Sequence, residues 1–156
     1  MDNCGTRFSK DKTPYKTNLG IIFWEGAGKK TENPGFYFHV TPYGLGLFCG
    51  VYTFTKEKLI LYRKAVDNES RGKELSQLIS AIEAADCQVG GDHYKRVQTG
   101  FEPDHPRADL LKYKGLHASI NDLDPELITK SEFMDYTIEQ WRKMAPLHRW
   151  LVRLAA

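Results

Sequence analysis

The sequence predicts an α+β fold, with an antiparallel or mixed β-sheet and helices packed mainly on one face. Strand-like segments come first, helix-like segments follow, and the same order then repeats, without the regular strand–helix alternation of a parallel sheet. Hydrophobic residues make up 41% and aromatic residues 12% of the 156 residues, which supplies enough apolar side chains for a buried core. The sequence contains no internal repeat and no long linker, so we expect a single domain over residues 1–156.

The first part of the chain should form a strand and a hairpin. Residues 18–24, NLGIIFW, are a short apolar run that ends at the glycine-rich loop EGAGKKTENPG. In the following segment, FYFHVTPYGLGLFCGVYTF, apolar residues at 36, 38 and 40 alternate with Tyr37 and His39, and the sequence PYG provides a turn. Tyr37 and His39 should therefore lie on the same face of the hairpin, opposite the apolar residues.

Two helices and two more strands should follow the hairpin. Thr55 is a suitable N-cap for a helix beginning KEKLILYRKAV, and a break is expected near DNES, at residues 67–70. The three-four spacing of apolar residues from Leu75 to Ala85 predicts a second amphipathic helix. Further strands are expected within GGDHYKRVQTGF and GLHASIND, separated by a short helical turn after the prolines of EPDHPRADLLKYK.

The C-terminal part of the chain should again be helical. Ser131 or Thr129 can cap a helix in EFMDYTIEQWRKM, and Pro146 should end it and restart a final amphipathic segment. The tail combines tryptophans with arginines, but helical spacing places the apolar residues on one stripe and the cations on the solvated side. This pattern is typical of a core helix.

The overall charge and the cysteines favour a cytoplasmic protein. The net charge is +2, from 22 basic and 20 acidic residues, which gives no broad attraction to nucleic acid or to an anionic membrane. No stretch approaches the roughly 18 consecutive apolar residues of a membrane span, and the start MDNCGTRF has no apolar leader. Cys4, Cys49 and Cys87 are far apart and odd in number, as expected for reduced structural thiols. We therefore predict no membrane partner.

The histidines are the residues most able to carry chemistry. None of the five shares the short spacing of a zinc site, so we predict neither a metal nor another cofactor. Strand alternation places His39 beside Tyr37 on a face that is aromatic and can take up a proton. A partly exposed strand histidine without a function is the commoner state for such a position.

Three segments resemble a known protein family. They are RFSKDKTPYKT near the start, PGFYFHVTPYG with GVYTF in the hairpin, and YKRVQTGFEPDHPRADLLKYKG later in the chain. They resemble the bacterial and fungal family called domain of unknown function 2461, whose members share an Arg-Asp-x-Arg-Phe core followed by Asp/Asn-Lys and Tyr. The resemblance covers nearly the whole chain. It implies an α+β domain and carries no activity or substrate.

The chain departs from the family pattern in two ways. Cys4 and Gly5 stand where the Arg-Asp pair of the family should fall, so a carboxylate that could orient Arg7 is missing. Family members also carry several dozen residues with helices ahead of this motif. Either the chain is a shortened relative that lacks this segment, or a second copy of the protein provides the missing cover. The second alternative predicts a homodimer.

The positions that match the family pattern, together with His39, define the predicted site. Its expected ligand-binding residues are Arg7, Lys12, Tyr15, Lys16, Tyr37, Tyr52 and Lys112. The cations would hold a small anionic ligand that bears a phosphate or a carboxylate, and the tyrosines would orient its organic part. His39 and His105 are the candidate general acid or base, and the sequence does not decide whether the protein is an enzyme.

Two other functions remain possible from the sequence. The same residues could be structural in a non-catalytic, homodimeric interaction module. Nucleic-acid binding through the lysines near the start of the chain is less favoured, because the net charge is small.

Overall fold

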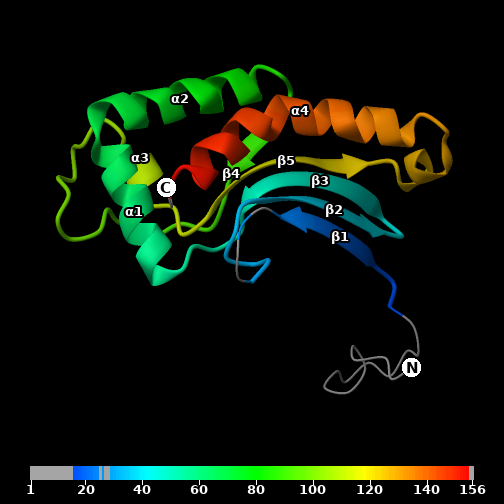
Figure 1. Ribbon diagram of the computed structural model, residues 1–156, viewed down its shortest axis with the longest axis horizontal. Coiled ribbons are helices and arrows are strands. Elements are labelled where there is room, and N and C mark those ends of the chain that lie inside the picture. The colour runs from blue at the N-terminus through cyan, green and yellow to red at the C-terminus, as the bar shows by residue number, and fades with distance from the viewer. Residues whose placement is uncertain (1–15, 25, 27–28, 155–156) are drawn as a thin grey trace.

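The computed structural model (Figure 1) describes residues 16–24, 26 and 29–154. Its centre is a five-stranded sheet with the strand order β1-β2-β3-β5-β4. The strands are β1 (Leu19–Trp24), β2 (Gly35–Thr41), β3 (Gly44–Val51), β4 (Gln88–Gly90) and β5 (Leu116–Leu123). Every neighbouring pair is antiparallel. The predicted α+β fold with an antiparallel sheet is therefore confirmed.

The helices are α1 (Lys56–Asp67), α2 (Glu69–Glu83), the short α3 (Ala108–Leu111) and α4 (Phe133–Val152), with a 3-10 helix η1 (Pro125–Thr129) before α4. Helices α2 and α4 cover one face of this sheet, and α1 and α3 pack beside its end (Figure 1). Figure 1 shows α2 and α4 lying along the same side of the sheet, with no described helix on the other side. We call the uncovered side the open face.

The hydrophobic core lies between the sheet and the helices. Strand alternation turns Leu47, Cys49 and Ala118 toward the helices, and all three side chains are fully buried. The same cluster includes Trp150 and Met144 of α4. Strands β3 and β5 therefore share one core with the last helix, and this packing holds the sheet against α4.

Short polar side chains begin the first two helices. The Thr55 hydroxyl accepts a hydrogen bond of 3.2 Å from the main-chain N–H of Lys58, as predicted for an N-cap. Asn68 separates α1 from α2, and its side-chain oxygen accepts a hydrogen bond of 3.0 Å from the N–H of Arg71. The predicted break near residues 67–70 is therefore a single residue that ends one helix and caps the next.

Two predicted elements are wrong. The strand expected within residues 90–101 is absent from the described structure, because β4 ends at Gly90 and only the bridge between His93 and Tyr113 follows it. This segment has no apolar alternation that would hold one face on the core. Helix α4 also continues through Pro146, which does not restart it. Buried Met144 and Leu147 on either side of the proline keep both halves on the sheet.

None of the described helices is both long enough and apolar enough to cross a membrane.

Candidate functional site on the open face of the sheet

A continuous row of rings crosses the open face. His39 and Tyr37 of β2 stack with ring centroids 5.9 Å apart, and Tyr37 lies 5.8 Å from Phe48 of β3. Phe48 lies 6.0 Å from His117 of β5, and His117 stacks on Tyr52 at 6.2 Å. We call these five residues the ring row. These separations are typical of interacting aromatic rings.

Glycines beneath the ring row make room for two of its rings. A Cβ atom at Gly20 would stand 2.5 Å from the Tyr37 hydroxyl oxygen, and one at Gly46 would stand 2.7 Å from the Phe48 ring. Both distances are too short for real atoms, so each ring occupies the space that a side chain would take. The Tyr37 and Phe48 rings consequently lie close to the main chain at these two glycines.

Two members of the ring row, Phe48 and His117, were not among the predicted site residues, and His117 is the one that can titrate. Its Nδ1 atom is buried and has no hydrogen-bond partner among the described residues. Burial lowers the pKa of the imidazole below its ordinary value, and the nearby Asp92 carboxylate opposes this only in part. His117 is therefore held neutral between Phe48 and Tyr52. Alternation within GLHASIND, combined with the alternation of the hairpin, could have placed it on this face.

A small hollow lies beside His39 at one end of the ring row. Its volume is about 200 Å³, and its lining includes His39, Phe48, Gly46, Asn121 and Asp122. Between the register pairs Leu45–Leu123 and Leu47–Ile120, β5 contains one residue more than β3, which makes a β-bulge beside the hollow. Bulges re-aim side chains, and this one brings Asn121 and Asp122 to the rim.

The structure brings together some of the predicted site residues. Tyr37, His39 and Tyr52 all lie on the open face, within the ring row. Lys16 is exposed and precedes β1. Arg7, Lys12 and Tyr15 lie outside the described residues.

His105 and Lys112 lie elsewhere, beside α1 and α3. His105 Nε2 is 3.4 Å from the Asp67 carboxylate at the end of α1, and its Nδ1 accepts a hydrogen bond of 3.0 Å from the Arg107 N–H. Lys112 pairs with Asp109 at 2.7 Å. The His105–Asp67 contact ties the loop before α3 to the end of α1, whereas the Lys112–Asp109 pair is local to α3. The two residues therefore do not join Tyr37 and His39 in one site.

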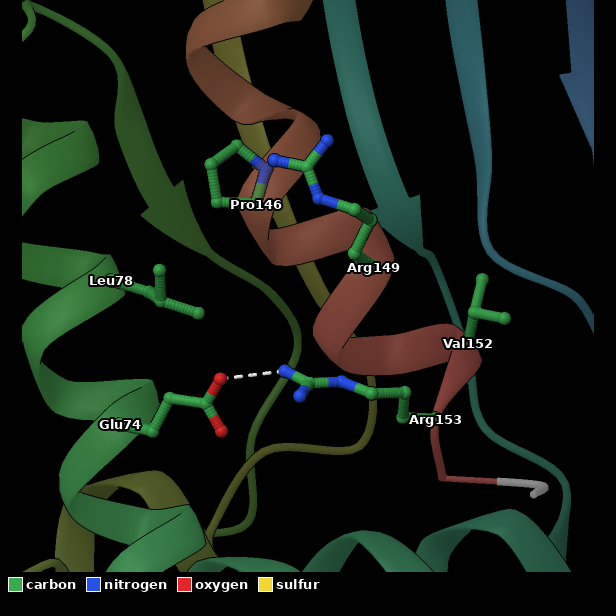
Figure 2. Close-up of a pocket in the computed structure, with 6 residues that line it drawn as sticks. All are labelled: Glu74, Leu78, Pro146, Arg149, Val152 and Arg153. Carbon is green, nitrogen blue, oxygen red and sulfur yellow. Dashed lines mark hydrogen bonds and ion pairs between the residues drawn. The ribbon is translucent and has the colours of Figure 1, made fainter.

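A larger groove lies between α2 and α4, on the helical side of the molecule. Its volume is about 530 Å³, and Figure 2 shows the residues that line it. Glu74 and Arg153 point toward each other across the groove and form an ion pair of 2.6 Å, whereas Arg149 extends along α4 toward Pro146 (Figure 2). Glu74 therefore compensates one of the two guanidinium charges. The groove contains none of the predicted site residues and has the character of a seam between two helices.

Comparison with known proteins places the chain in a family. No curated protein and no solved structure matches it significantly. A family model described as "Conserved hypothetical protein (DUF2461)" matches residues 4–150, which is most of the chain. This agrees with the three segments noted in the sequence. The chain belongs to the DUF2461 family of conserved hypothetical proteins.

Proposed function

We propose that the protein binds a small anionic ligand with a planar ring, and that this ring stacks on the ring row of the open face. The observation that carries the proposal is the unbroken series of ring contacts from β2 to β5. Half-buried and exposed rings on a sheet present π-faces on which another planar group can stack. Polar groups at the ends of the row would orient the ligand.

His39 is the residue best placed to contact the anionic group. It lines the hollow, and its imidazole nitrogens have no hydrogen-bond partner among the residues that the structure describes. A hollow of about 200 Å³ is smaller than a typical drug-sized pocket of roughly 300–1,000 Å³. It suits a single ring with a carboxylate or a phosphate better than a large cofactor.

Lys16, just before β1, provides a positive charge on the side of the sheet where the hollow lies. β1 runs antiparallel to β2, with Leu19 opposite Val40 and Gly20 opposite His39. The chain before Leu19 therefore comes from the side of the β2–β3 turn, where the hollow lies. Lys16 is three residues from Leu19, so its Cα lies within about 10 Å of that residue. The carboxylate of Asp122 at the opposite rim would direct an anion toward the His39 side.

The expected affinity is modest. Stacking of a base on an aromatic side chain is worth about 1–3 kcal/mol, and a hydrogen bond to a charged group about 1.5–3 kcal/mol. Because ordering the ligand opposes these gains, dissociation constants between millimolar and micromolar are expected. If the bound ligand reacts, His39 is the candidate general acid or base, because both nitrogens of His105 already have partners.

The ring row supports a small ligand better than a nucleic acid. The residues of the row and of the hollow include no lysine or arginine. Proteins that bind single strands combine stacking rings with a basic groove that follows the phosphates.

Ligand-detected NMR and thermal shift would test the proposal. The probes are benzoate, phenyl phosphate and adenosine monophosphate, with acetate, inorganic phosphate and benzamide as controls that lack either the ring or the charge. We expect at least one ring-bearing anion to raise the melting temperature and to bind more tightly than its matched controls. Tyr52→Ala and His39→Ala should each weaken this binding at least threefold.

His105→Ala is the matched histidine control, since His105 lies away from the open face. It should leave ligand binding unchanged. Equal binding of all probes, or binding that Tyr52→Ala and His39→Ala leave intact, would contradict the proposal.

A further inference from the structure

Strand β1 forms an apolar edge of the sheet. It pairs with β2 on one side, and the sheet order leaves its other side without a neighbouring strand in the described structure. Its sequence LGIIFW contains no charged residue and no proline. Leu19 is 50% exposed, Ile21 43%, Phe23 57% and Trp24 46%. Four large apolar side chains of one short strand thus remain in contact with solvent.

Proteins usually protect such an edge. Lysine, proline, a bulge or a very short strand prevents an exposed edge from pairing with another chain. The opposite edge of this sheet follows the rule, because β4 has only three residues. β1 has six residues and none of these protections. It therefore offers a row of main-chain donors and acceptors flanked by apolar side chains.

We propose that β1 pairs in antiparallel fashion with β1 of a second copy of the chain, around a two-fold axis at Ile21. Two-fold symmetry makes the same patch serve both partners, so the patch must be complementary to itself. The sequence of β1 meets this requirement. Leu19 would face the partner's Phe23, and Ile21 would face its own copy, so that apolar side chains meet on one side of the sheet, while Gly20 would face the partner's Ile22 on the other.

This register also keeps the two copies correctly oriented. Leu19, Ile21 and Phe23 point to the helical side of the sheet, as their register partners Val40, Phe38 and Phe36 do. Residues that face each other across an antiparallel pair point to the same side. The helices of both copies would therefore lie on one side of a continuous sheet. The ring row of each copy would stay uncovered on the other side.

The size of the contact predicts a reversible dimer. An aromatic side chain buries about 150–250 Å² when it is fully covered, and Phe23 and Trp24 are each about half covered already, as are the smaller Leu19 and Ile21. Complete covering of all four would therefore add at most about 400 Å² of side chain per copy to the strand edge, or at most roughly 1,000 Å² for the pair. This lies at the lower limit of specific interfaces. We expect a monomer–dimer equilibrium at micromolar concentrations, without an obligate dimer.

Substituting Ile21 with lysine or with glutamate tests both the identity of the partner and the register of the strands. Sedimentation equilibrium of the wild type should show a mass that rises with concentration toward twice the chain mass of 17.9 kDa. Ile21→Lys and Ile21→Glu should each be monomeric at 200 μM, because two like charges would meet at the axis. An equimolar mixture of the two variants should regain the dimer, because each pair then joins a lysine to a glutamate.

Ile60→Lys is the matched control, because Ile60 is an exposed isoleucine on α1, away from β1. It should dimerise like the wild type, and circular dichroism of all variants should show the wild-type helix content. A wild type that stays monomeric at 200 μM would overturn the proposal, and another occupant of the edge would then be indicated. A dimer that survives both Ile21 substitutions would place the interface elsewhere. Failure of the mixture to dimerise would exclude this register.

Discussion

The thiol of Cys49 lies 3.6 Å from the main-chain carbonyl oxygen of Met144, which joins the middle of the sheet to the last helix inside the core. Both residues are fully buried. The contact connects residues that are 95 positions apart in the sequence, so it reports on whether the native packing has formed.

Alkylation of Cys49 should therefore depend on unfolding. Burial raises the pKa of the Cys49 thiol to about 12, so the reactive thiolate is almost absent at pH 8. We expect iodoacetamide to leave Cys49 unmodified in the native protein and to modify it fully in urea. Peptide mass spectrometry resolves this cysteine from the others. Rapid labelling of Cys49 in the native protein would show that the core is open.

His117 should make the stability of the protein depend on pH. Its pKa in the folded protein lies below the ordinary value of 6.5. Above pH 6.5 both the folded and the unfolded states are neutral at this residue. As the pH falls below 6.5, the unfolded chain takes up a proton more readily than the folded protein, and the free energy of unfolding decreases.

The variant His117→Phe should remove this contribution. Urea unfolding at several pH values between 7.5 and 5.0 would measure the difference in slope between the wild type and the variant. Equal slopes would mean that His117 is not desolvated on the open face.

Arg107 should stabilise the end of α1. Its Nε atom donates a hydrogen bond of 2.7 Å to the carbonyl oxygen of Val66, and its guanidinium donates another of 3.1 Å to that of Asp67. Removing these donors leaves the last carbonyls of the helix without these partners. We expect Arg107→Ala to lower the free energy of unfolding by about 1–3 kcal/mol. Lys112→Ala, which removes an ion pair with an exposed partner, should cost at most about 1 kcal/mol.

Gly50 should tolerate no side chain. Its φ angle is +140°, and a Cβ atom there would lie 2.3 Å from the carbonyl oxygen of Leu116. Gly50→Ala should therefore cost more than about 1 kcal/mol of stability. Gly90 also lies opposite His117, but a Cβ atom at Gly90 would meet nothing within 4 Å. Gly90→Ala is thus the control, and thermal unfolding of the two variants should separate them clearly.

Local sequence patterns predicted the elements whose side chains alternate or repeat regularly. The alternation from Phe36 to Thr41 correctly placed Tyr37 and His39 on one face, because a strand must keep its apolar residues on the core. Thr55 marked the start of α1, because a capping side chain acts within one turn. These signals are local, so the sequence alone contains them.

The remaining features depend on contacts between distant residues. Pro146 indicated a break in the last helix, yet packing of Met144 and Leu147 on the sheet keeps α4 continuous. Alternation could have indicated the face on which His117 lies, but its contacts with Phe48 and Tyr52 depend on the pairing of β5 with β3, and a single sequence gives no register between strands. His105 was predicted as a site residue because its position matches the family pattern. Such a match does not indicate where the side chain lies in the fold.

The placement of two rings on the open face depends on positions that lie beneath them. Gly20 and Gly46 lie beneath Tyr37 and Phe48, and a side chain at either position would displace the ring above it. A random mutational screen for loss of recognition should therefore recover changes at 20 and 46 as often as changes in the rings themselves. The shape of this surface therefore depends on residues that lie beneath the rings.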